Sequence, residues 1–161
     1  MTDAQTPAAD TQPQVAVFNI EKLYVKDLSL EIPHAPGIFL ERENPQIDLQ
    51  LHTAATAVEE GVFEVTVMVT VTAKLPEKDK VMFLIEAKQA GIFQVRNIPA
   101  AETETVLAIM CPNILYPYLR EVVSDLAVRA GFAPVVLNPI NFEALYQQQK
   151  QQQAAAPAVT H

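Results

Sequence analysis

The amino-acid sequence predicts an α+β fold: a four-stranded antiparallel sheet followed by a long helix and a short C-terminal helix. Between residues 18 and 92, apolar and polar side chains alternate with a period of two, which is typical of strands. Between residues 114 and 126, the apolar positions recur at i, i+3 and i+4, which indicates a helix. Short polar turns join the second, third and fourth strands, so we expect these strands to form an antiparallel meander.

The first strand is expected over residues 18–32. Its even positions are mostly apolar and its odd positions mostly polar, which places Tyr24 on the apolar side. The alternation slips at Leu23 and Val25, and such a slip predicts a bulge or bend in the strand. Pro33 ends the strand, because proline cannot donate to the hydrogen-bond ladder.

The next three strands differ in how many of their faces are apolar. Residues 47–51 and 63–71 both alternate, and the second of these runs is the cleaner and predicts a strand with one buried face. The fourth run, residues 81–92, is apolar on both faces apart from Glu86 and Lys88. Because a strand of this kind has to be covered on both sides, we expect the sheet to bury a second face somewhere.

The long helix is expected to begin with Pro112 in its first turn and to end at Arg129, with Gly131 as the residue that follows its C-terminus. Asn141 is expected to cap a short last helix from Phe142 to about Gln149. Prolines interrupt the longest uncharged stretch, so we find no run of the ~18 apolar residues that a membrane span needs.

One domain is expected between two tails. Residues 1–14 and 150–161 are rich in Ala, Gln, Thr and Pro and cannot bury enough apolar surface to order themselves, so both are expected to be disordered. Residues 15–149 then form the domain, and their number suits a single hydrophobic core.

Composition and charge narrow the classes of partner. Of the 161 residues, 50% are hydrophobic and only 19% are charged, so the chain has more apolar surface than a monomer of this size needs. The net charge of −8 argues against nucleic acid and anionic membranes as partners, because both are bound through Lys and Arg. No basic segment precedes an apolar run at the N-terminus, and we expect a cytoplasmic protein without direct membrane insertion.

The patterns required for catalysis or cofactor binding are missing. The three histidines show no metal-ligand spacing and the four glycines form no phosphate-binding loop, so no metal and no cofactor is expected. Cys111 is placed at the start of a helix, where the helix dipole lowers the pKa of a thiol, and a small hydrolase using Cys111 is one alternative function. A second alternative is a monomeric module that encloses a small apolar ligand in a closed cavity.

Four segments of the chain together resemble the SecB family of bacterial protein-export chaperones. The strongest is CPNILYPYLRE at residues 111–121. The others follow the family's order: YVKDLSLE at 24–31, QAGIF at 89–93 and LNPINFEALY at 137–146. The resemblance extends over residues 18–146 and leaves out both tails.

The resemblance implies a SecB-like fold and a function without catalysis. Members of the family are ATP-independent holdases, which bind unfolded preproteins in apolar grooves and pass them to the SecA ATPase for export. They assemble as homotetramers, each a dimer of dimers. The expected partners of this chain are therefore unfolded preproteins, SecA and three further copies of itself.

The resemblance also implies two sets of site residues. The SecA-docking positions are Asp27, Glu31, Leu84 and Glu86. The positions expected to line the client groove are Leu49, Leu51, Phe83, Tyr118 and Phe142. Broad apolar contact of this kind suits promiscuous binding, because it demands no particular sequence from the client.

Overall fold

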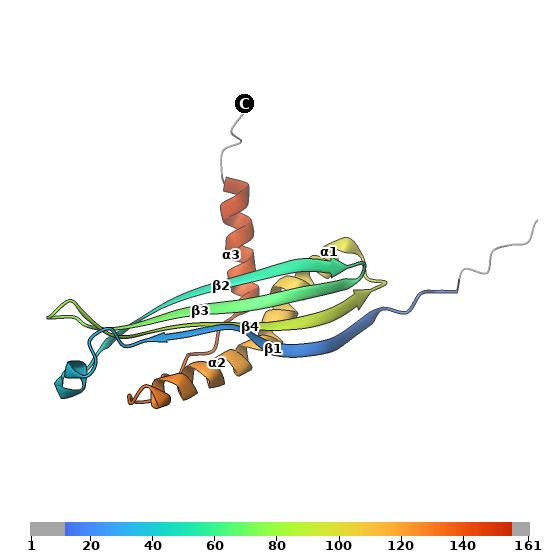
Figure 1. Cartoon of the computed structure of the whole chain (residues 1–161). Helices are drawn as coiled ribbons and strands as arrows, with labels where there is room; N and C mark the ends of the chain where they lie inside the picture. Colours follow the sequence, from blue (N-terminus) through green and yellow to red (C-terminus); the bar gives the residue numbers. More distant parts are fainter. Residues whose placement is uncertain (1–11, 156–161) are drawn as a thin grey trace, which may run out of the picture.

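The computed structural model describes residues 12–155, which form one sheet with helices on one of its faces (Figure 1). The elements in chain order are strand β1 (Val17–Glu31), the 3₁₀ turn η1 (Gly37–Leu40), strands β2 (Gln46–Glu59), β3 (Val62–Leu75) and β4 (Lys80–Arg96), helix α1 (Ala100–Thr105), the π-helical turn η2 (Val106–Met110), and helices α2 (Cys111–Arg129) and α3 (Phe142–Ala155). The α+β architecture expected from the sequence is confirmed.

The sheet has the strand order β1-β4-β3-β2, and all three neighbouring pairs are antiparallel. The meander of β2, β3 and β4 is confirmed. The first strand pairs with the last, so β1 and β2 form the two edges of the sheet. Figure 1 shows α2 running along one face of these long strands and α3 pointing away from them.

The bulge expected in β1 is present and moves one side chain to the other face. The pairing of β1 with β4 shifts at two places, between Ile20 and Lys22 and between Val25 and Asp27. Between the two shifts Leu23 packs against the core, while Tyr24 forms a hydrogen bond with Glu64 on the other face. The placement of Tyr24 on the apolar side was therefore wrong, because the bulges reverse the alternation over this stretch.

The hydrophobic core lies between the sheet and α2. The odd-numbered residues of β3 and β4 face the helix, and those from Val65 to Val71 are at most 2% exposed. Gly91 allows the close approach of α2, because a Cβ at this position would lie 3.1 Å from Leu115 and only 2.7 Å from the ring of Phe93. Phe93 in turn stacks on Phe18 of β1, with ring centroids 5.9 Å apart.

No helix covers the second face of β4 within the described residues, although Ala90 on this face is 0% exposed. Leu84, Glu86 and Ile92 on this face remain partly exposed, whereas Phe83 and Ile85 on the helix side are buried. The doubly apolar pattern of β4 was expected to be buried on both sides. Any cover for the second face therefore has to come from outside this part of the chain.

The long helix begins earlier than the sequence predicted. Helical backbone runs without a break from Ala100 to Arg129, so Pro112 lies inside the helix rather than in its first turn. The π turn η2 accommodates this proline: the N–H of Cys111 donates to the carbonyl of Val106, five residues back, just before the residue that has no N–H to donate.

This longer helix also corrects the expectation about membrane-spanning segments. The helix of 30 residues is long and apolar enough to cross a membrane, by length and composition alone. The core helix of a soluble protein meets the same test, and one face of α2 packs on the sheet. The expectation was wrong because residues 105–119 were interpreted as broken by Pro112, Asn113 and Pro117, whereas the helix continues through them.

The ends of the helices follow the expected signals, with one difference. Gly131 has a φ of +88°, and the N–H of Phe132 donates to the carbonyl of Ala127, which together close α2. Asn141 caps α3 through its side chain, which accepts from the N–H of Ala144 at 3.0 Å. Helix α3 continues to Ala155 rather than ending near residue 149, so the described part of the expected C-terminal tail is helical.

Residues 12–14 lack regular structure, and residues 1–11 and 156–161 of the two expected tails lie outside the described residues.

Candidate functional site

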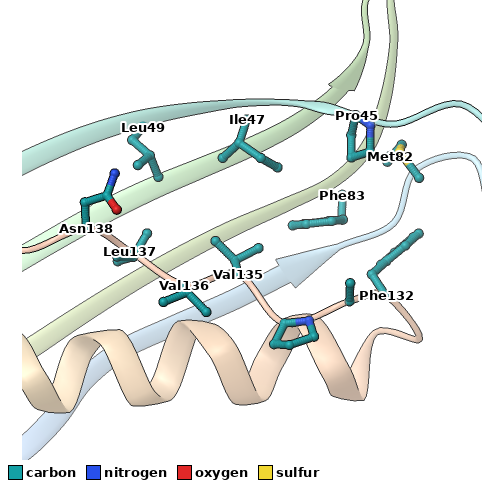
Figure 2. A pocket seen from close by; sticks show the side chains of 12 residues that line it. Pro45, Ile47, Leu49, Met82, Phe83, Phe132, Val135, Val136, Leu137 and Asn138 are labelled. Atoms are coloured by element: carbon teal, nitrogen blue, oxygen red, sulfur yellow. The ribbon is translucent and has the colours of Figure 1, made fainter.

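An open apolar groove of about 590 Å³ lies between the start of β2, the start of β4 and the segment that follows α2. Figure 2 shows its lining, to which Asn138 contributes the one polar side chain. The lining residues are Pro45, Ile47, Leu49, Met82, Phe83, Phe132, Ala133, Pro134, Val135, Val136, Leu137 and Asn138. The lining is thus apolar along almost its whole length and carries little that could select a particular sequence.

The segment of residues 132–138, which we call the strap, forms one wall of this groove. The turn at Gly131 reverses the chain after α2, and Pro134 and Pro139 keep the strap from forming a helix. Aromatic contacts hold the beginning of the strap, because the ring of Phe132 lies 4.8 Å from that of Phe83, measured between centroids. The strap therefore leaves an apolar surface open to solvent, where Val136 is 72% exposed.

Ion pairs connect the two loops at one end of the sheet. Lys78, in the hairpin between β3 and β4, lies 2.5 Å from Glu41 and 3.4 Å from Glu43, both in the loop that leads to Pro45 of the groove. The hydrogen bond from Lys78 lowers the pKa of Glu41, and the same bond raises the pKa of Lys78. The loop that carries one end of the groove is thus attached to the neighbouring hairpin.

The five residues expected to line the groove lie in four different places. Leu49 and Phe83 line the groove itself. Leu51 packs against the core on the same face of β2, and Tyr118 is half exposed on α2. Phe142 is buried beside Tyr116, with the ring planes at 77° and the centroids 5.6 Å apart. The structure therefore brings two of the five together at the groove.

The strap residues that line the groove were not singled out from the sequence. Val135, Val136 and Leu137 form an apolar run between two prolines, and a loop with this composition is unusual because loops normally face water. That apolar run was the one sign in the sequence that these residues form a binding surface. It indicated an exposed apolar segment but not which strands lie opposite it.

The four expected docking residues lie together on the face of the sheet away from α2. In the pairing of β1 with β4, Glu31 is opposite Leu84 and Ser29 is opposite Glu86, while Asp27 is opposite Lys88. Residues paired in this way project from the same face. Within residues 12–155, the carboxylates of Asp27, Glu31 and Glu86 form no ion pair, and the two on β1 are exposed.

A second charged cluster lies beside these carboxylates on the same face. Glu64 of β3 accepts hydrogen bonds from the hydroxyl of Tyr24 and from the Nζ of Lys26, the latter at 2.5 Å. The hydrogen bond to Glu64 raises the pKa of Tyr24 from its ordinary value to about 12. Hydrogen bonds from Lys26 and Tyr24 lower the pKa of Glu64, and the charge of Lys88 adds to this effect.

Cys111 does not have the environment of a reactive thiol. It lies inside a continuous helix, not at a helix start as expected from the sequence, and its side chain is 0% exposed. Burial raises the pKa of the Cys111 thiol to about 12, so the nucleophilic thiolate does not form at neutral pH. Among residues 12–155, no group of three or more His, Cys, Asp or Glu side chains is placed to hold a metal ion.

Comparison with known proteins identifies the family. The family described as preprotein translocase subunit SecB matches residues 10–153. The protein-export protein SecB of Nitrosomonas eutropha is 66% identical over 90% of this chain and 91% of its own length, and that of Methylobacillus flagellatus is 56% identical over 99% of each chain. A Mycobacterium tuberculosis SecB-like chaperone, solved in complex with a ChAD peptide from an antitoxin, has the same fold with a TM-score of 0.62 at 19% identity, covering 76% of this chain and 90% of its own. The chain belongs to the SecB family of protein-export chaperones.

Proposed function

We propose that the chain is an ATP-independent holdase that binds unfolded preproteins in the apolar groove and keeps them competent for export. The observation that carries this proposal is the groove, which is open and lined by apolar side chains from two strands and the strap. Unfolded preproteins expose apolar segments of many sequences, and a surface with one polar lining residue can bury such segments without requiring a particular order of side chains.

The edge position of β2 supports the same proposal. β2 ends the sheet, so one side of its backbone pairs with no other strand in the described chain, and Ile47 and Leu49 of this strand line the groove. Backbone groups at an open edge can bind an extended segment whatever its side chains are. The SecB-like chaperone with the same fold was solved with a bound peptide, which supports a client-binding role.

We assign delivery of the client to a separate surface. The docking surface consists of Asp27, Glu31, Leu84 and Glu86 on the face away from α2. Its three carboxylates are unpaired among residues 12–155, so they are available to a partner that brings positive charge. We propose that this partner is the SecA ATPase, that the protein acts in the cytoplasm, and that neither a cofactor nor catalysis is involved.

Self-assembly accounts for the apolar surface that one chain leaves exposed. On the outer side of the long helix, Met110 is 46%, Tyr118 49% and Val128 53% exposed, which is more than a monomer needs to leave in water. We propose a homotetramer, formed as a dimer of dimers, that buries part of this surface. Light scattering is expected to give a mass of about four chains, whereas the mass of one chain would favour the monomeric binding module.

The holdase activity itself is tested by diluting a urea-unfolded preprotein into buffer that contains this protein and no nucleotide. We expect aggregation of the preprotein, followed by turbidity, to be suppressed at about one tetramer per client. Addition of ATP should leave the extent of suppression unchanged, since nothing in the proposed mechanism consumes it. Aggregation as fast as in buffer alone would contradict the proposed function.

A further inference from the structure

Lys26 is a cation that lies directly beside the carboxylates of the docking surface. It directly precedes Asp27 in β1, at the place where the pairing with β4 shifts between Val25 and Asp27. A bulge changes the direction of the side chains around it, and here the Nζ of Lys26 reaches Glu64 on the same face as the docking surface. The ammonium group of Lys26 therefore lies beside the carboxylate of Asp27, to which we assigned a positively charged partner.

Glu64 binds this ammonium group from another strand. The Nζ of Lys26 lies 2.5 Å from the carboxylate of Glu64, while Asp27 accepts instead from the backbone N–H of Leu28 at 3.0 Å. The hydroxyl of Tyr24 donates to the second oxygen of Glu64 and so helps to fix the carboxylate in place. The side chain of Glu64 is 18% exposed and that of Lys26 44%, so the pair is only partly in solvent.

We propose that Glu64 is a positioning residue of the docking surface: it holds Lys26 away from Asp27 and so keeps the acidic surface unpaired for a cationic partner. This inference rests on the proposed docking of SecA. Two further cations lie on this face: Lys22 is opposite Ile92 in the strand pairing, and Lys88 is opposite Asp27. The charge of Lys88 also acts on Glu64. Without the Glu64 carboxylate, the charge of Lys26 reaches its acidic neighbours in the docking surface.

The test compares the affinity for purified SecA, measured by calorimetry, between the full-length protein and its Glu64→Gln variant. We expect Glu64→Gln to weaken SecA binding about three- to fivefold, the range expected for charges near a protein surface. Glu60→Gln is the matched control, because it removes the same charge from the exposed turn between β2 and β3. It should change the affinity less than twofold.

A rescue experiment separates this role from a merely structural one. If Glu64 acts by holding Lys26, then Lys26→Met combined with Glu64→Gln should bind SecA as well as Lys26→Met alone. A second variant, Tyr24→Phe, removes the hydroxyl that fixes Glu64 and should weaken binding in the same direction by a smaller factor. Unchanged affinity in Glu64→Gln, or no recovery on removal of Lys26, would overturn the inference.

The inference and the proposed docking surface can fail separately. Charge reversal of Asp27 and Glu86 to lysine tests the surface itself in the same assay. If that variant binds SecA normally, the docking proposal is wrong and the role of Glu64 is wrong with it. If it loses affinity for SecA while Glu64→Gln does not, the proposed docking surface is supported and only the role of Glu64 is refuted. Thermal unfolding of each variant verifies that the fold is kept.

Discussion

Replacing both Leu49 and Val136 by aspartate is expected to weaken the binding of an unfolded preprotein roughly thirtyfold. Both side chains line the groove and are 47% and 72% exposed, so the fold does not depend on their burial. Burying an apolar side chain of this size fully contributes about 1.5–3 kcal/mol, and about half of that per residue is available to a client. The two substitutions together therefore cost about 2 kcal/mol of binding free energy. Because each 1.4 kcal/mol changes the affinity tenfold, this loss corresponds to a roughly thirtyfold weaker affinity.

The measurement is the fluorescence anisotropy of a labelled, unfolded preprotein titrated with each variant. Val58→Asp combined with Leu40→Asp is the matched control, because it adds the same two charges at positions that are 59% and 83% exposed but do not line the groove. We expect this control to bind like the unsubstituted protein. Equal losses in the control and in the groove variant would mean that client binding follows net charge rather than the groove.

Reversing the charges of Asp27 and Glu86 to lysine is expected to weaken SecA binding about tenfold and to leave preprotein binding unchanged. Each substitution replaces an attraction by a repulsion, and an exposed charge pair contributes up to about 1 kcal/mol. The docking surface and the groove lie on opposite faces of the sheet, since Leu49 and Phe83 face the helix side while Glu86 faces away. The two functions should therefore respond to different substitutions.

Calorimetry with SecA at two salt concentrations checks this prediction. The affinity of the unsubstituted protein should fall as salt rises, because exposed charges are screened at distances beyond about 10 Å in 0.1 M salt. The charge-reversed variant should show little of this salt dependence. SecA binding that is equal in both proteins would contradict the assignment of the docking surface.

The sheet was predictable from the sequence because its signals are local. Alternation with a period of two is a property of neighbouring residues, and residues 67–71 alternate between buried and partly buried positions in the structure. The bulges in β1 were visible as slips at Leu23 and Val25, but the new orientation of Tyr24 was not. Which way a bulge turns a side chain depends on the register against β4, a contact far apart in the chain.

The helix start was missed for a similar reason. Pro112 was interpreted as a first-turn proline, since that is where proline is usually tolerated. In the folded chain, the π turn at Val106–Met110 shifts the hydrogen-bond ladder and lets the helix pass through the proline. Nothing in the local pattern of residues 100–110 distinguishes this arrangement from a loop, so the position of Cys111 was misjudged as well.

The sequence suggested site residues only where it matched a motif of the family. The four expected docking residues were proposed from the resemblance alone, and the pairing of β1 with β4, which the sequence did not predict, puts them on one face. The groove needs the strap to lie across β2 and β4, which depends on the reversal at Gly131 and on the contact of Phe132 with Phe83. Tyr118 and Phe142 are apolar in the sequence, but packing places them on the surface of α2 and in the core instead.

Hydrogen exchange of the full-length protein, with and without a bound unfolded preprotein, tests client binding in the groove most directly. The account predicts slower exchange at the backbone N–H groups of the strap and of residues 46–51 when the client is bound, because these segments form the two walls of the groove. The docking face, followed at residues 27–31, should exchange as in the free protein. Unchanged exchange in the strap, with protection confined to other parts of the chain, would contradict the account.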